Sequence, residues 1–451
     1  MGSLFVRDRQ FYRHFFVIAL PVVLQSCITI GVNMLDTIML GSFGEGYLSA
    51  TSLSNQFFNL YQIICMGLGG GAAVLTAQAW GRKDGMAIKK AVTIMLRIAI
   101  TVAVLFTVVT CLFPRQIMSI YTKEALVLDD CERYFQYLCY CFFFQGIAVT
   151  LTQVLRSVKE TRVPLLAAIL SFFTNLFFNY VMIFGKLGFP RMEIEGAALA
   201  TLIARIAECV FIGGYVFFFD QRMKYRLKDL TMRCRDQLGE YLHYGLPVLM
   251  SDFLLGLGNN AIAVVMGHIS QSFVAAFSIT SITQQMCNIF TTGVTNASSV
   301  IVGNTLGEKD GQKAYEQGKT FIVMSVILGI AAALVILLIR EPVISMYNIE
   351  PETVAITRSL MDGVSFMIIF RMMGSVLTKG VLRGGGDTRF LMIADIIFLW
   401  CASVPLGYLA GIVLRLSAFW TFFFLNIDHF IKSFWCLLRF RSKKWIHIIE
   451  R

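Results

Sequence analysis

The chain has 451 residues, of which 57% are hydrophobic and only 15% are charged, and its mean hydropathy is +0.69. A typical soluble domain has about 25% charged residues, so this composition excludes a soluble globular protein and indicates a polytopic membrane protein. The formal net charge of +11 would suit nucleic-acid binding in a soluble protein. Here the basic residues lie in short loops between apolar segments, so we interpret them as topology signals and expect no nucleic-acid partner.

Twelve apolar segments are each long enough to cross a bilayer as a helix, which takes roughly 20 residues. In chain order they comprise residues 14–40, 47–79, 91–113, 133–155, 163–184, 196–219, 240–266, 273–304, 320–339, 357–382, 390–413 and 416–438. The second and the eighth are longer than one crossing needs, so we expect them to tilt or to extend beyond the bilayer. The predicted fold class is an all-α integral membrane protein.

The basic residues predict the orientation of these helices. If the N-terminus is cytoplasmic, the loops on the cytoplasmic side hold most of the 39 lysines and arginines. Because loops that stay in the cytoplasm are enriched in these residues, we expect a multi-pass protein of the inner (cytoplasmic) membrane with both termini in the cytoplasm.

The two halves of the chain repeat one another. A shift of 226 residues aligns Leu20–Val22 with Leu246–Val248, and Lys83–Gly85 with Lys309–Gly311. Six segments per half return the chain to its starting side, so the repeat predicts two six-helix lobes related by a pseudo-two-fold axis along the membrane normal, with the substrate path between them. The predicted parts are an N-terminal lobe (1–219), a cytoplasmic linker (220–239), a C-terminal lobe (240–438) and a cytoplasmic tail (439–451).

One carboxylate, Asp36, lies near the far end of the first segment. A charge inside a membrane helix is costly and therefore marks a candidate functional site. Asn175 and Asn179 are four residues apart on one helix face, and with Thr201 they lie at a similar expected depth. We predict that these four residues bind a cation or a proton. Asp36, Asn175 and Asn179 would supply oxygen ligands if Na⁺ is used, whereas a desolvated Asp36 would bind H⁺.

The alternative for this cluster is structural. Asp36 would then only cap or cross-link helices, and the two asparagines would be ordinary interhelical hydrogen bonders.

Several of these features together resemble the multidrug and toxic compound extrusion (MATE) family along essentially the whole chain. They are Pro21 and Asp36 in the first segment, Gln78–Arg82, Gly303–Gly307, Asn175, Asn179 and Gly196–Thr201. The resemblance implies a secondary active antiporter that exports amphipathic, often cationic drugs or metabolites in exchange for Na⁺ or H⁺ by alternating access. It implies no enzymatic activity and no cofactor besides the coupling ion. The NorM-like members carry a glutamate where this chain has Leu254–Leu257, so the chain is identified as nearer the DinF-like members.

Other polar residues inside the spans are candidates for the substrate pocket, with a packing role as the alternative. They are Asp252, Asp395, Gln56, Asn33, Asn259 and Arg371. For Arg371 we expect a partner among Asp362, Asp252 and Asp395. We expect Arg205 to pair with Glu208, and Asp428 with Lys432, because each pair shares a helix face. Pro21 and Pro247 are the candidate helix bends, since proline removes a backbone donor.

Two other functions remain open at this stage. One is a lipid-linked saccharide flippase of the same superfamily, which would want a strongly cationic cavity. The other is a membrane sensor without transport, which would leave the set of Asp36, Asn175 and Asn179 unexplained. The expected partners are small organic substrates and the lipid bilayer, and we expect a monomer.

Overall fold

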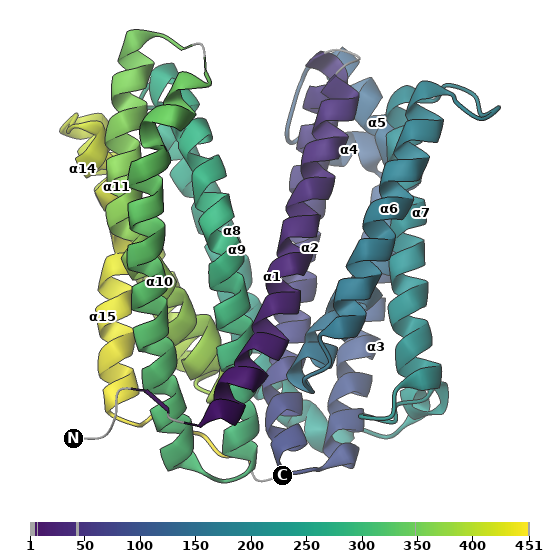
Figure 1. The fold of residues 1–451 in the computed structure, drawn as a ribbon. Coiled ribbons are helices and arrows are strands. Elements are labelled where there is room, and N and C mark those ends of the chain that lie inside the picture. The colour runs from purple at the N-terminus through teal and green to yellow at the C-terminus, as the bar shows by residue number, and fades with distance from the viewer. Residues whose placement is uncertain (1–4, 7, 42–44, 348, 450–451) are drawn as a thin grey trace. The chain divides into compact units, whose positions relative to one another are not determined.

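The computed structural model describes residues 5–6, 8–41, 45–347 and 349–449, and within these ranges it contains helices and no strand. Ten of the described helices are long and apolar enough to cross a membrane. The predicted all-α membrane fold class is therefore confirmed, and every predicted apolar segment coincides with helix in the structure (Figure 1).

The helices of the first half begin and end close to the predicted positions. They are α1 (Arg9–Gly41), α2 (Glu45–Gly81), α3 (Gly85–Leu112), the short α4 (Pro114–Met118), α5 (Ala125–Ser157), α6 (Arg162–Phe184) and α7 (Glu193–Gly214), which a π-helical turn η1 (Tyr215–Phe219) extends. A 3₁₀ turn, η2 (Leu227–Thr231), lies in the polar connection to the second half.

The second half contains helices of similar maximal length and more irregular ones. They are α8 (Arg235–Gly267), α9 (Gln271–Gly307), α10 (Gly311–Ser345), α11 (Pro351–Ser375) with η3 (Val376–Leu382), α12 (Thr388–Ile396) with η4 (Ile397–Ser403), α13 (Val404–Tyr408) with η5 (Leu409–Val413), α14 (Ala418–Leu425) and α15 (Ile427–Arg441). The last predicted segment is not one helix, because Asn426 has a non-helical backbone and separates α14 from α15.

The chain divides into two compact units by its internal contacts. The unit that we call the N-terminal unit comprises Pro21–Thr76 and Asp84–Leu249, and the C-terminal unit comprises Met1–Leu20, Ala77–Lys83 and Met250–Arg451. The division passes through α1 immediately before Pro21 and through α8 three residues after Pro247. The lobe and linker boundaries that we derived from the repeat differ from this division and stay a prediction.

The sequence repeat is visible in the backbone at two equivalent turns. Asp84 caps α3 by accepting a hydrogen bond from the Ala87 amide, and Asp310 caps α10 in the same way. The preceding residues, Lys83 and Lys309, have φ angles of 61° and 64°, a left-handed conformation that is uncommon outside glycine. The Lys-Asp-Gly repeat therefore encodes one turn twice, with the aspartate satisfying a free amide of the helix that follows.

The ends of α2 and α9 approach each other within the C-terminal unit through two glycines. A Cβ atom on Gly81 would collide with the carbonyl group of Asn304, and one on Gly307 would collide with that of Gln78. The repeat aligns Gly81 with Gly307 and Gln78 with Asn304, so the contact is reciprocal. Only glycine permits this backbone approach, which explains why both copies of the segment end in it.

Candidate cation-binding site

The predicted cation-binding residues come from three helices of the N-terminal unit. Asp36 is half-buried near the end of α1, Asn175 and Asn179 are buried on α6, and Thr201 is half-buried on α7. The helices α6 and α7 pack closely because Gly196 lies against the backbone of α6, where a Cβ atom would come within 2.8 Å of the Met182 carbonyl carbon. The small residues that open α7 therefore bring Thr201 near the two asparagines.

Hydrogen bonds connect the four side chains into one cluster. The Asn179 Nδ2 donates to Asp36 Oδ1 over 2.5 Å and to Asn175 Oδ1 over 3.0 Å. The Asn175 Nδ2 lies 3.5 Å from Thr201 Oγ1, at the outer limit of a hydrogen bond. All four residues that we predicted from the sequence therefore lie together in the structure.

The cluster retains oxygen atoms that have capacity for a further partner. The Asn179 Oδ1 is buried and has no hydrogen-bond partner among the described residues. Asp36 likewise has no ion pair within the described part of the chain, although Arg205 is near enough to act on it electrostatically. Buried polar atoms are rarely left unpaired, so these oxygens favour an additional cationic or protic ligand.

Sequence reasoning missed Tyr134, a residue of α5 that belongs to this site. Its side chain is 4% exposed and lies close enough to Thr201 and Asp36 to interact electrostatically with both. Nothing in the local sequence distinguishes Tyr134 from the other aromatic residues of α5. Only the packing of α5 against α7 brings it to the cluster.

Arg205 does not pair with the carboxylate of the site. Its guanidinium donates to Glu208 Oε2 over 2.7 Å, one turn along α7, which confirms the predicted pair. The positive charge of Arg205 is therefore offset on its own helix.

Two of the predicted substrate-pocket residues are carboxylates of the C-terminal unit that take part in ion pairs. Asp252 on α8 accepts from Lys379 over 3.1 Å and from Arg383 over 3.0 Å. Asp395 on α12 pairs with Lys432 over 2.8 Å. Their role in substrate binding stays a prediction.

The expected partners of Arg371 were wrong. Its guanidinium donates to Gln284 Oε1 on α9 over 2.7 Å. The three carboxylates that we considered are bound to other cations, namely Asp362 to Arg340, Asp252 to Lys379 and Arg383, and Asp395 to Lys432. The partner of Arg371 is therefore a neutral amide, which a search for opposite charges in the sequence does not identify.

The remaining candidates are exposed polar residues on separate helices. Asn33 lies on α1, Gln56 on α2 and Asn259 on α8. Pro21 and Pro247 both lie inside continuous helices, so the structure interrupts neither α1 nor α8 at its proline. The predicted bends and pocket roles stay predictions.

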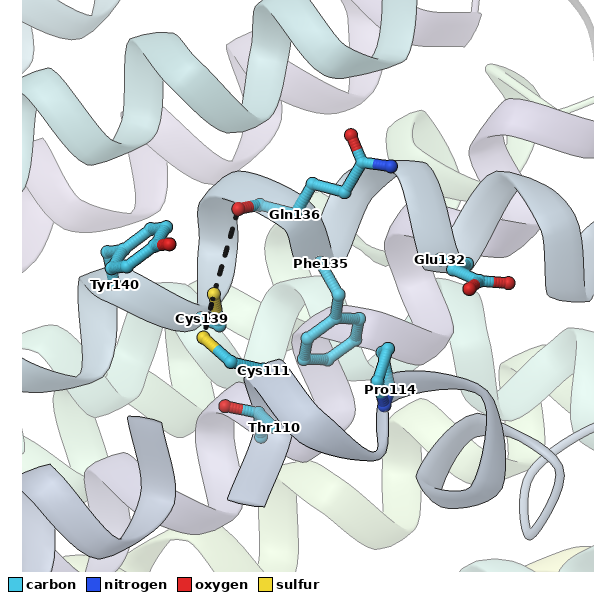
Figure 2. Close-up of a pocket in the computed structure, with 8 residues that line it drawn as sticks. All are labelled: Thr110, Cys111, Pro114, Glu132, Phe135, Gln136, Cys139 and Tyr140. Atoms are coloured by element: carbon cyan, nitrogen blue, oxygen red, sulfur yellow. Dashed lines mark hydrogen bonds between the residues drawn. The ribbon is translucent and has the colours of Figure 1, made fainter. Parts of the chain in front are cut away.

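A pocket of about 280 Å³ lies elsewhere in the N-terminal unit, between the end of α3 and α5 (Figure 2). Cys111 and Cys139 face each other there, with their Sγ atoms 2.6 Å apart, and Glu132 lies at its edge. None of the predicted site residues lines this pocket, so it is separate from the cation-binding cluster.

A sequence profile of the MatE family matches residues 21–181 and 247–409, which together make up more than half of the chain. The two matches begin at Pro21 and Pro247, the prolines that the internal repeat aligns. The chain belongs to the MatE family. It is therefore a multi-pass membrane transporter and not an enzyme.

Relatives of this MatE protein match it over nearly their whole length. It is 26% identical to a probable multidrug resistance protein NorM of Thermotoga maritima, over 95% of this chain and 92% of that protein. It is 24% identical to the multidrug resistance protein PmpM of Pseudomonas aeruginosa, over 90% of this chain and 85% of that one.

A solved structure supports the same fold assignment. It is described as an outward-facing conformation of a multidrug resistance MATE family transporter of the MOP superfamily, and its TM-score with this chain is 0.87. The match covers 98% of this chain and 99% of that chain at 18% identity. The likeness shows that this MatE protein has the predicted fold of twelve helices in two lobes.

Proposed function

We propose that this MatE protein is an antiporter that exports amphipathic, often cationic organic compounds in exchange for Na⁺ or H⁺. The observation that carries the proposal is the pairing of Asp36 with Asn179, a carboxylate that has no ion pair among the described residues and an amide whose buried Oδ1 has no partner there. A membrane protein keeps such a costly arrangement where a mobile charge is to be bound. The names of the relatives, which denote multidrug resistance proteins, support the substrate class.

The residues of the cluster suit either coupling ion. Na⁺ prefers hard oxygen ligands, by extension from other hard cations, and the cluster offers a carboxylate, two amide oxygens and a hydroxyl. A proton would instead bind Asp36 directly and turn it into a hydrogen-bond donor. In either case the charge of Asp36 is neutralised when the ion enters.

Alternating access couples this neutralisation to export. The ion enters from outside down its gradient, and each 100 mV of membrane potential adds about 2.3 kcal/mol per charge to its inward movement. Neutral Asp36 no longer holds Asn179 through a charge-assisted hydrogen bond, so α1 shifts relative to α6, with Pro21 as the bend. The ion drives export because it binds one conformation more tightly than the other.

The proposal extends to placement in the cell. The protein resides in the cytoplasmic membrane with both termini in the cytoplasm and acts as a monomer. We also propose the DinF-like branch, because α8 carries no acid between Leu254 and Leu257. Several relatives are named NorM, which points to the other branch. Identifying which residues bind the ion would distinguish the two branches.

Ethidium efflux from proteoliposomes under separately imposed Na⁺ and H⁺ gradients tests the function. We expect the native protein to export ethidium under one gradient only, which names the coupling ion, and we expect Asp36→Asn to abolish the response. Asp129→Asn is the matched control, because Asp129 is an exposed acid of the same unit whose side chain pairs with Arg115 at the surface.

Two results would contradict the proposal. Normal gradient-driven efflux by Asp36→Asn would remove Asp36 from the coupling step. If the native protein moved no ethidium under either gradient, export of multidrug substrates would be excluded. Lipid-linked saccharides would then be the next substrates to assay.

A further inference from the structure

A lysine ammonium is buried between two carboxylates in the C-terminal unit. The Lys432 Nζ on α15 lies 2.8 Å from Asp395 Oδ1 on α12 and 3.6 Å from Asp428 Oδ2, one turn earlier on α15. The three side chains are only 3–6% exposed. Taking this many charges out of water is expensive, so the arrangement calls for an explanation beyond helix packing.

Serine hydroxyls hold the two carboxylates through the oxygen atoms that do not contact the ammonium. The Ser251 Oγ on α8 donates to Asp395 Oδ2 over 2.5 Å, and the Ser403 Oγ on η4 donates to Asp428 Oδ1 over 2.8 Å. Carboxylates and hydroxyls are the ligands that hard monovalent and divalent cations take in proteins. The two carboxylates, each held by a serine, thus form an oxygen cage, and the cation inside it is part of the chain.

Two other basic groups face this cage. The His429 Nδ1 lies 3.7 Å from Asp428 Oδ2. Arg371 on α11 acts on Asp428 electrostatically while its guanidinium is bonded to Gln284. Neither approaches the carboxylates as closely as Lys432 does, so the ammonium is the cation that occupies the cage.

The internal repeat relates this cage to the cation-binding cluster of the N-terminal unit. With one residue inserted, the repeat aligns Thr161 and Arg162 with Thr388 and Arg389 at a shift of 227 residues. The same shift, carried further along the chain, places Thr201 on Asp428 and Arg205 on Lys432. Both halves therefore carry a basic residue one turn after a residue that faces the site. The two basic residues differ in what they bind.

Arg205 and Lys432 have different partners because the residue three positions after each of them differs. In the N-terminal unit Glu208 accepts from Arg205 over 2.7 Å, which offsets the basic charge within α7. The same shift places Trp435 at the position of Glu208, so Lys432 has no acid there. The lysine instead turns to Asp395 and Asp428, whereas Asp36 is left without an ion pair among the described residues.

We propose that Lys432 is a built-in cation that replaces a mobile ion in the C-terminal half of the transporter. Its ammonium is tethered to α15, so its effective concentration at the cage is high and it cannot dissociate. The C-terminal half then exchanges no ion of its own. It follows, on the basis of the function proposed above, that the protein exchanges one cation or proton per cycle through Asp36.

The test removes the tethered cation and asks whether a mobile one takes its place. All variants carry Asp36→Asn, so the N-terminal cluster contributes nothing and the result does not depend on whether Asp36 is the coupling residue. In this background Lys432→Ala and Lys432→Gln open the cage, whereas Lys432→Met removes the charge but fills the space. Lys313→Ala, which removes an exposed lysine, is the control.

Equilibrium binding of ²²Na⁺ to the purified variants is the readout, with the Tm in NaCl and in choline chloride as a second measurement. We expect Lys432→Ala and Lys432→Gln to gain about one Na⁺ per chain and to have a higher Tm in NaCl than in choline chloride. We expect no gain in Lys432→Met, in Lys313→Ala or in the Asp36→Asn parent. Adding Asp395→Asn to Lys432→Ala should abolish the gain.

The proposal is overturned if folded Lys432→Ala and Lys432→Gln bind no Na⁺, or if their carboxylates take up a proton in its place. It is equally overturned if both variants fail to fold even at high NaCl, because a mobile cation then cannot replace the ammonium. Failure of the proposed antiport would appear separately, as a native protein whose ethidium efflux ignores both gradients.

Discussion

Asp36 on α1 accepts a 2.5 Å hydrogen bond from Asn179 on α6, and this contact joins the only acidic side chain of its helix to a buried amide. The amide is held in turn by Asn175, so Asp36 is tied to a fixed donor rather than to a mobile counter-ion. Any ion that neutralises Asp36 must weaken this contact.

Asn179→Ala should alter ion binding more than any other change on α6. The variant removes the donor to Asp36 and the unpartnered Oδ1 together, and a hydrogen bond to a charged group contributes about 1.5–3 kcal/mol. Because the donated hydrogen bond stabilises charged Asp36 and weakens when an ion neutralises it, its loss should raise the apparent affinity for H⁺ by roughly tenfold or more, whereas loss of the Oδ1 ligand should lower the apparent affinity for Na⁺. Ethidium efflux as a function of ion concentration measures this. Asn59→Ala, an exposed asparagine of α2, should leave the curve unchanged, and an unchanged curve for Asn179→Ala would exclude Asn179 from the site.

Tyr134→Phe should have a smaller effect on the same curve. The change removes a buried hydroxyl near Thr201 and Asp36 and keeps the buried ring, so packing in the unit is preserved. A neutral polar contact contributes no more than a hydrogen bond, about 0.5–1.5 kcal/mol, so we expect at most a several-fold loss of apparent ion affinity at an unchanged maximal rate. An effect on Tm with no effect on ion affinity would make Tyr134 a packing residue only.

Gly81→Ala should destabilise the C-terminal unit because the added methyl group meets the carbonyl of Asn304. Overpacking of this kind typically costs about 1–3 kcal/mol. Gly85→Ala is the matched control, since nothing lies within 4 Å of its Cβ position and alanine favours a helix. The Tm in detergent should fall for Gly81→Ala and hold or rise for Gly85→Ala. Equal Tm values for the two variants would mean that α2 and α9 do not approach as described.

The C-terminal tail should detach when the solution becomes acidic. Asp387, in the loop before α12, accepts from Arg439 over 2.7 Å and lies 3.8 Å from His447 of the tail. Burial raises the pKa of Asp387, but the nearby His447 side chain and the hydrogen bonds from Arg439 lower it by more, so the net pKa is below the ordinary value.

The sign of this pH dependence follows from the lowered pKa. Unfolded Asp387 takes up its proton near pH 4, whereas the folded residue does so only at lower pH. The anchoring is thus complete at neutral pH and is lost as the pH falls from about 4 toward the folded pKa. Protease protection of residues 442–449, followed between neutral pH and about pH 3, measures it. Asp387→Asn should give weaker and pH-independent protection over that range, and a native profile in this variant would show that Asp387 does not anchor the tail.

Part of this protein could be predicted from its sequence because the governing forces are local. Apolar length determines which segments cross a bilayer, and the backbone of each helix satisfies its own hydrogen bonds, so all twelve segments were found to be helical over most of their length, the last one as two helices. The repeat also appears in the sequence, since Lys83–Gly85 and Lys309–Gly311 form the same capped turn in both copies. The set of Asp36, Asn175, Asn179 and Thr201 could be nominated because polar groups are rare at membrane depth.

The partners of the buried charges were decided by tertiary structure alone. Lys432 shares a helix face with Asp428, as predicted, yet its shorter contact is with Asp395, 37 residues earlier in the chain. Arg371 bonds to Gln284, and Tyr134 reaches Thr201, although no sequence pattern connects them. Hydropathy and helical period specify how far along the membrane normal a residue lies. Which side chains of neighbouring helices meet at that depth depends on helix rotation and close packing, and those are properties of the folded chain.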